Sequence, residues 1–174
     1  MTDHTPPYAA GRSYFFDVQL DDTAPIKLTD HVDLLRQSIR ISQRRNPFDI
    51  DAAVVLPRRV LMLWTMPEGD TSYSARWHVI KATFRRHAPQ FQRDIWQPRF
   101  TEHKIRTQVD YDLHTHLIMT APIRAGLVRR AVDWPWSSLH HRVPVSDHVK
   151  VRLPRRMPPK AAAGLPSWLL DQAG

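Results

Sequence analysis

A short apolar run bounded by two prolines constrains the fold more than any other part of the sequence. Residues 56–67 read LPRRVLMLWTMP, and residues 60–64 within them are typical of a buried β-strand. Residues 50–56, IDAAVVL, form a second β-rich run just before. Residues 57–59 between the two runs are too few for a crossover between parallel strands. The sequence therefore predicts an antiparallel hairpin here.

Apolar periodicity predicts the other elements. Residues 13–20 read as a strand, residues 29–45, 73–87 and 107–120 as helices, and residues 95–105 as an extended segment. Thr29 and Asp30 are the candidate caps of the first helix. The predicted buried stripes are Val32, Leu35 and Ile39, then Trp77, Ile80 and Phe84, then Val109, Leu113 and Leu117. This order of elements predicts an α+β fold, a ferredoxin-like split βαβ sandwich around an antiparallel sheet.

Length and composition limit the class of protein. A chain of 174 residues is long enough for one domain, and we expect a flexible arm at residues 1–12, a domain at 13–142 and a basic, proline-rich tail at 143–174. No run is long enough to cross a membrane, the N-terminus has no apolar leader and there are no cysteines, so a cytoplasmic protein is expected. The net charge of +8 favours a nucleic-acid partner.

Short motifs are spaced along most of the chain. They include Tyr14-Phe15-Phe16, Leu56-Pro57, Trp64-Thr65 with Pro67, Gly69-Asp70, Arg76-Trp77, Ile95-Trp96-Gln97, Glu102-His103, Ile105-Arg106 and Asp133-Trp134-Pro135. Together these motifs resemble the REP-associated branch of the single-tyrosine, HUH-type transposases. The resemblance covers residues 11–143. It implies an HUH-endonuclease fold and, for the family, cleavage and rejoining of single-stranded DNA beside a hairpin.

The resemblance also implies which positions carry the family's chemistry. The family has His-hydrophobe-His in the second hairpin strand, which holds Mg²⁺ or Mn²⁺, and Tyr-Ile-x-x-Asn-Pro in its last helix. Arg59 and Leu61 stand at the two histidine positions, Leu117 at the nucleophile and Ala121 at the asparagine. An arginine cation cannot bind a metal, and leucine has no nucleophilic atom. We therefore expect no intact catalytic residue and no metal cofactor.

Other residues could in principle replace the lost groups. Tyr111 lies six residues before Leu117, so it projects from another face of the predicted helix. His114 and His116 diverge on a helix, and a polar helix face is the favoured interpretation of both. His103 resembles a retained family histidine, and contact with DNA and a structural role are equally compatible with its position.

The equipment for DNA binding is still present in the sequence. Arg12 lies on the arm, where the resemblance implies contact with the foot of a hairpin. Trp96 and Phe100 could stack on bases, whereas Trp134 and Trp136 fit the core better. We expect one basic surface around the former catalytic cleft, formed by Arg12, Lys81, Arg85, Arg86, Arg99, His103, Arg106 and Arg124.

These observations predict a DNA-binding protein, derived from a single-tyrosine transposase, that binds single-stranded or hairpin DNA with a palindromic repeat without cleaving it. It would act as a monomer or homodimer. One alternative is an active DNA-nicking transposase with a rearranged site. Another is a protein-interaction module, in which Leu61 and Leu117 fill the cleft with apolar surface.

Overall fold

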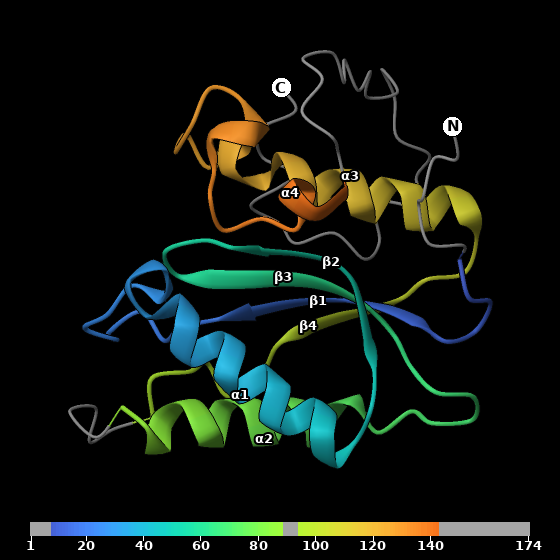
Figure 1. The fold of residues 1–174 in the computed structure, drawn as a ribbon, viewed down its shortest axis with the longest axis horizontal. Coiled ribbons are helices and arrows are strands. Elements are labelled where there is room, and N and C mark those ends of the chain that lie inside the picture. Colours follow the sequence, from blue (N-terminus) through green and yellow to red (C-terminus); the bar gives the residue numbers. More distant parts are fainter. Residues whose placement is uncertain (1–7, 89–93, 143–174) are drawn as a thin grey trace.

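The structure, a computed structural model, describes residues 8–88 and 94–142 and is built on one four-stranded antiparallel sheet (Figure 1). The strands are β1 (Ser13–Gln19), β2 (Asp49–Val55), β3 (Arg59–Thr65) and β4 (Thr101–Lys104), in the order β2-β3-β1-β4. With one helix between β1 and β2 and another between β3 and β4, this is the ferredoxin-like arrangement. The predicted fold class is confirmed.

The predicted hairpin forms one side of the sheet, with β2 at the edge and β3 inside it. β2 and β3 pair along their length, with an irregularity between Ile50 and Ala52, and the Leu56 amide donates to the Arg59 carbonyl at 2.8 Å. β3 also pairs with β1, so it is covered on both edges and both faces. Strand β3 is therefore nearly all apolar, as buried central strands are.

Two helices cover one face of the sheet, as predicted. They are α1 (Val32–Arg45) and α2 (Tyr73–Arg86), and their predicted apolar stripes are buried. Between helices and sheet, the Trp64 and Trp77 rings stack with centroids 4.7 Å apart. The predicted start of the first helix is corrected: a 3-10 turn, η1 (Leu28–His31), comes first, and His31 rather than Thr29 or Asp30 precedes α1.

A third helix, α3 (Gln108–Arg124), crosses the other face of the sheet (Figure 1). The Thr107 side chain caps it by accepting from the Asp110 amide at 3.1 Å. The helix continues through Pro122, so its predicted end at residue 120 is too early. Of the predicted stripe, Leu117 is buried but Val109 is 71% exposed. The buried face also includes Tyr111, His114, Ile118 and Ala121.

The segment after α3 covers the free edge of β2. Beyond η2 (Ala131–Asp133), the Val55 amide donates to the Trp136 carbonyl at 2.9 Å, and the Ser138 amide donates to the Ala53 carbonyl at 2.8 Å. A short helix, α4 (Leu139–Arg142), follows. Trp134 and Trp136 pack against the two cores, as expected, but both are half-buried, so part of each side chain stays exposed. An exposed strand edge is thereby protected from pairing with another chain.

Some predictions fall outside the described part of the chain. They concern residues 1–7 of the arm and the whole tail at residues 143–174. Within the described residues, no helix is long and apolar enough to span a membrane.

Arg76 is a buried arginine on α2. It is only 1% exposed and ties the start of α2 to the turn before β2. Its guanidinium donates to Asp70 at 2.7 Å and to the carbonyls of Asn46 and Pro47 at 3.2 and 2.9 Å. The hydrogen bonds from Arg76 hold the pKa of Asp70 well below its usual range. A fully paired guanidinium can be buried where a single charge could not.

Replacing Arg76 with methionine should therefore lower the free energy of unfolding substantially. We expect a loss of about 3 kcal/mol, since the carbonyls and Asp70 lose a charged donor. The matched control is Arg86→Met, an exposed arginine on the same helix, which should change stability by less than about 0.5 kcal/mol. Urea unfolding of both variants measures the difference. Equal losses would contradict the structural role of Arg76.

Candidate functional site: the former catalytic cleft and its surroundings

Three of the four positions at which the resemblance places catalytic groups belong to the hydrophobic core. Leu61 and Ala121 are 0% exposed and Leu117 is 2% exposed. Leu61 and Ala121 lie in one apolar cluster between the sheet and α3, together with Phe15 and Ile118. Their side chains offer neither a metal ligand nor a nucleophile, and their burial keeps them from a bound phosphate.

The fourth position, Arg59, is paired inside the protein. Its guanidinium donates to Asp17 at 3.0 Å and to the Gln19 side chain at 3.3 Å. The Asp17 side chain is fully buried in β1, opposite Leu61. Burial raises the pKa of Asp17, although the charge and hydrogen bond of Arg59 act in the opposite direction. Arg59 therefore lies at the predicted place, but a carboxylate of the same sheet partly neutralises it.

All four tyrosines of the chain lie within the described residues, and none has the character of the family's nucleophile. Tyr111 and Tyr14 are buried, at 0% and 5% exposure. The Tyr8 hydroxyl donates to a backbone carbonyl at 3.1 Å. Tyr73 lies on α2, across the sheet, and burial with a hydrogen bond to Glu102 raises its pKa to about 12. A phenol needs an accessible, ionisable oxygen to attack a phosphodiester.

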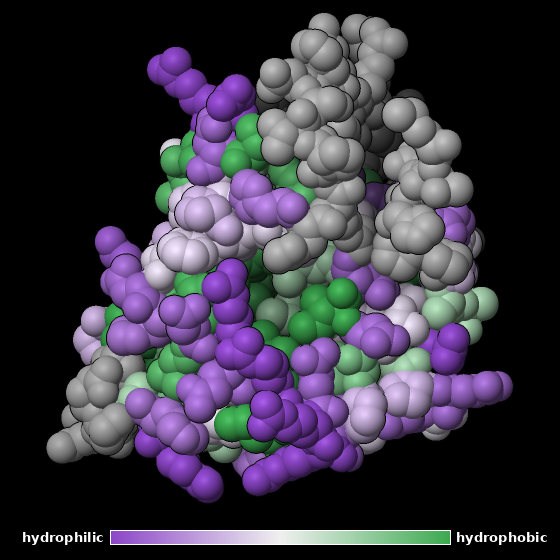
Figure 2. Space-filling view, viewed as in Figure 1, coloured by the Kyte–Doolittle hydropathy of each residue, from purple (hydrophilic) through white to green (hydrophobic). Residues whose placement is uncertain are grey.

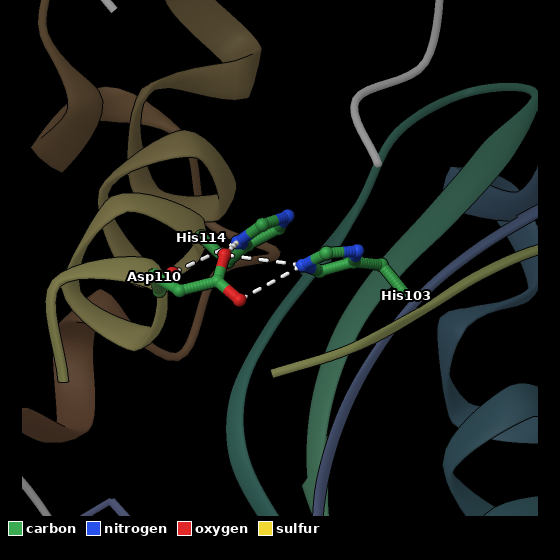
Figure 3. Close-up of side chains that lie close together, drawn as sticks. All are labelled: His103, Asp110 and His114. Carbon is green, nitrogen blue, oxygen red and sulfur yellow. Dashed lines mark hydrogen bonds and ion pairs between the residues drawn. The ribbon is translucent and has the colours of Figure 1, made fainter. Parts of the chain in front are cut away.

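A histidine pair shares one carboxylate between β4 and α3 (Figure 3). His103 Nε2 lies 2.9 and 3.1 Å from the two Asp110 carboxylate oxygens. His114 Nδ1 lies 3.0 Å from one of these oxygens and 2.8 Å from the backbone carbonyl of Asp110. His114 is completely buried, so the predicted polar helix face is wrong for this residue. His116, by contrast, is only partly buried.

By residue type, His103, Asp110 and His114 could hold a metal ion, since their donor atoms lie within 4.8 Å of one another. Their geometry does not fit one. The two imidazole rings stack at 4.7 Å with planes only 16° apart, whereas an ion must lie near the plane of each ring that binds it. His103 Nε2 and His114 Nδ1 face oxygen acceptors, so each of these nitrogens carries a hydrogen. The arrangement is that of N–H groups donating to one carboxylate.

This carboxylate ties α3 to the edge strand of the sheet. The Arg106 amide also donates to it at 3.1 Å. Burial alone would raise the pKa of Asp110, but hydrogen bonds from His114, His103 and the Arg106 amide hold it well below its usual range. Asp110 is therefore ionised at neutral pH, and it positions the loop that carries Arg106.

The structure brings together two of the predicted DNA-binding residues. The Ile105 amide donates to the Ser13 carbonyl at 2.9 Å, which extends the pairing of β4 with β1. Arg12 and Arg106 are the next residues along the two paired segments, so they are neighbours at this end of the sheet. Arg106 is exposed and Arg12 half-buried. We call these two residues the Arg12–Arg106 pair.

The expectation of one continuous basic surface is wrong for the residues of α2. Lys81, Arg85 and Arg86 lie on α2, whereas α3 and the former cleft lie on the opposite face of the sheet (Figure 1). Lys81 is also engaged: it donates to the Gln97 carbonyl at 2.9 Å, and burial lowers its pKa. Arg85 and Arg86 are exposed.

The other predicted contact residues are more scattered. Arg99 is exposed in the loop before β4, and half-buried Arg124 donates to Thr120 at 3.4 Å near the end of α3. His103 is held by Asp110. Trp96 is 3% exposed, so it presents no free face for a base, and half-buried Phe100 packs on the same core.

Sequence reasoning missed the acidic partners, Asp17, Asp70 and Asp110. Only Asp17 could have been recognised from the sequence, because it is a carboxylate in the middle of an apolar strand. Such a residue needs a buried partner. Asp110 looks like an ordinary first-turn residue of a helix. The spacing of four residues to His114 predicts that these two side chains can meet, but the sequence does not indicate that His103 of β4 shares the same carboxylate.

Comparison with known proteins finds relatives that match most of the chain. The chain is 41% identical over 143 residues to the REP-associated tyrosine transposase of Escherichia coli K12, covering 82% of this chain and 86% of that protein. It is 32% identical over 155 residues to a putative REP-associated tyrosine transposase of Haemophilus influenzae, covering 82% and 88%. No model of a protein family matches the chain.

A solved structure of a REP-associated tyrosine transposase bound to a REP hairpin is also similar. It has a TM-score of 0.73 and 37% identity and covers 87% of this chain and 94% of that one. The four-stranded sheet with α1 and α2 on one face and α3 on the other is an HUH-type α+β domain. Within that class, the chain belongs to the REP-associated tyrosine transposase family.

Asp110→Asn should weaken the fold most at neutral pH. Because the pKa of Asp110 is lowered by folding, its stabilisation is present above the ordinary aspartate pKa of about 3.9 and is lost as the pH falls below it. We expect the variant to lose about 1–3 kcal/mol at neutral pH and to show a flatter decline in acid. Asp112→Asn, exposed on the same helix, is the control. Urea unfolding across the acid range would contradict this account if Asp110→Asn and Asp112→Asn gave the same curve.

Proposed function

We propose that the chain binds single-stranded or hairpin DNA carrying a palindromic repeat and does not cleave it. The observation that carries the proposal is the combination of a retained family fold with core leucine and alanine at three catalytic positions. Leu61, Leu117 and Ala121 contribute to the packing of α3 on the sheet instead of to chemistry.

The family resemblance and the charge support DNA as the ligand. A member of the family, 37% identical to this chain, is known in complex with a REP hairpin. The net charge of +8 favours a polyanion, and the Arg12–Arg106 pair lies at neighbouring backbone positions at one end of the sheet. Arginine can bind phosphate through two parallel hydrogen bonds. Arg59 is not counted among these contacts, because Asp17 holds it.

The proposed absence of cleavage rests on the lost metal ligands, the lost nucleophile and the lack of a tyrosine that could replace it. The metal-ligand positions hold Arg59 and Leu61, the nucleophile position holds Leu117, and each tyrosine is buried or has its hydroxyl engaged. A covalent phosphotyrosine intermediate needs both the nucleophile and the polarised phosphate. The alternative of a rearranged nicking site thus has no candidate nucleophile among the described residues.

The remaining parts of the proposal concern organisation. Residues 13–142 would form the DNA-binding unit, with residues 143–174 as a basic tail, and the protein would act in the cytoplasm as a monomer or homodimer. The other alternative, an interaction module, required Leu61 and Leu117 to form an apolar surface, but both residues are buried.

Titration of labelled hairpin, linear single-stranded and random duplex DNA at several salt concentrations tests this function. We expect the hairpin to bind most tightly, with log K falling linearly as log salt rises. Arg12→Gln combined with Arg106→Gln should make the slope shallower by about 1.4, from roughly 0.7 per phosphate contact of a single strand.

Arg85→Gln combined with Arg86→Gln is the matched comparison, because it removes the same charge from the other face of the sheet. It should change the slope less than the Arg12–Arg106 double variant. Salt-independent affinity, or equal affinity for hairpin and random duplex, would favour a protein partner instead.

A further inference from the structure

A groove lies on the face of the sheet that the former cleft does not use. It has a volume of about 250 Å³ and runs between α1 and residues 136–138. Ala53, Val55 and Met62 form its floor, and Val32 and Leu35 of α1 form one wall. The side of the molecule drawn in Figure 2 has apolar surface in a hollow near its middle, with hydrophilic side chains around it. These floor and wall residues contact the core under α1, so the groove is separate from Leu61 and Ala121.

The polar rim of the groove carries positive charge. Arg36 and Arg40 line it, and Arg44 continues the row at the same spacing of four residues along α1. Side chains at this spacing lie on one face of a helix, about 5–6 Å apart at Cβ. Among residues 8–88 and 94–142, Arg40 and Arg44 have no ion-pair partner. Arg36 pairs with Asp33, but both side chains are largely exposed, so that pair is weak.

Trp136 supplies an aromatic wall whose position is fixed. Its backbone carbonyl accepts from the Val55 amide at 2.9 Å, which holds the segment on the edge of β2. The Arg36 guanidinium carbon lies 6.0 Å from the centre of the Trp136 ring. A cation row beside an aromatic ring is the combination with which proteins bind single strands, stacking bases on the ring and pairing phosphates with the cations.

From this geometry we propose that the groove holds one unpaired base of single-stranded DNA next to the hairpin, with Arg36 and Arg40 on the adjoining phosphates. The proposal rests on the proposed function. The groove is smaller than the roughly 300–1,000 Å³ of sites for larger ligands, so it suits a single ring system. No carboxylate lines it, which disfavours a basic partner.

The groove should accept different bases. Its two hydroxyls already take part in the fold, since Ser138 Oγ accepts from the Ala53 amide at 2.9 Å and Ser137 Oγ accepts from the Leu139 amide at 3.2 Å. The remaining contacts are apolar or aromatic, and every base has a face that can stack on such a surface. The groove therefore adds affinity for unpaired DNA without selecting its sequence.

The test compares a labelled hairpin that carries a short unpaired extension with the same hairpin lacking it, using the full chain. Arg36→Gln with Arg40→Gln removes the rim charge, and Ala53→Leu fills the floor. Each should weaken binding of the extended hairpin by roughly tenfold, on the order expected for one stacked base. The control variant Lys27→Gln with Arg129→Gln removes two exposed charges elsewhere. The affinity for the hairpin without the extension should change equally in the rim variant and in this control.

The outcomes separate the two proposals. If the rim variant loses no more affinity for the extended hairpin than the control does, the groove does not bind the base, while hairpin binding stands. If the unmodified chain binds no hairpin, the proposed function fails, and a linear single strand titrated against the same variants decides the groove alone. Should Ala53→Leu fail to fold, the rim variant, which changes only exposed side chains, still decides.

Discussion

Strand β3 is the constraint on which the rest of the structure depends. It is paired on both edges, and its side chains alternate between two cores, with Met62 and Trp64 toward α1 and α2 and Leu61 and Leu63 toward α3. Any residue at position 61 must therefore satisfy the packing of α3. A metal-binding histidine there would require a polar cavity under the helix. Leucine requires only apolar neighbours, and Ala121 and Ile118 supply them.

Buried polar contacts then hold the layers in position. Asp17 pairs with Arg59 within the sheet, Asp70 pairs with Arg76 at the start of α2, and Asp110 ties α3 to β4. Asp70 and Asp110 accept from several donors, which lower the pKa of each, whereas burial outweighs the pairing with Arg59 and raises the pKa of Asp17. These contacts account for charges in a core that would otherwise be apolar. The arginines of α1 and the Arg12–Arg106 pair, which take no part in these contacts, are among the cations available to an outside ligand.

The hairpin and the first two helices were predictable because local patterns encode them: an apolar run between prolines, and stripes such as Trp77, Ile80 and Phe84. The buried face of α3 was not, because His114 is polar in sequence and becomes a core residue only beside Asp110 and Phe15. The burial of Arg76 was not predictable either, because its partners include the backbone carbonyls of Asn46 and Pro47, about 30 residues earlier in the chain. The prediction of one basic surface was wrong for α2 because the positions of arginines in the sequence do not indicate on which face of the sheet each helix packs.

The most direct test of the central claim is to measure binding and cleavage in one sample. Stoichiometric protein is incubated with end-labelled REP-type hairpin DNA and Mn²⁺, and aliquots are separated on native and denaturing gels, with Leu117→Tyr run in parallel. The account predicts a native complex, full-length DNA and no label joined to protein for both proteins, since restoring tyrosine leaves Arg59 and Leu61 in place of the metal ligands. Shortened DNA, or a protein–DNA adduct that survives denaturation, from the unmodified chain would contradict it.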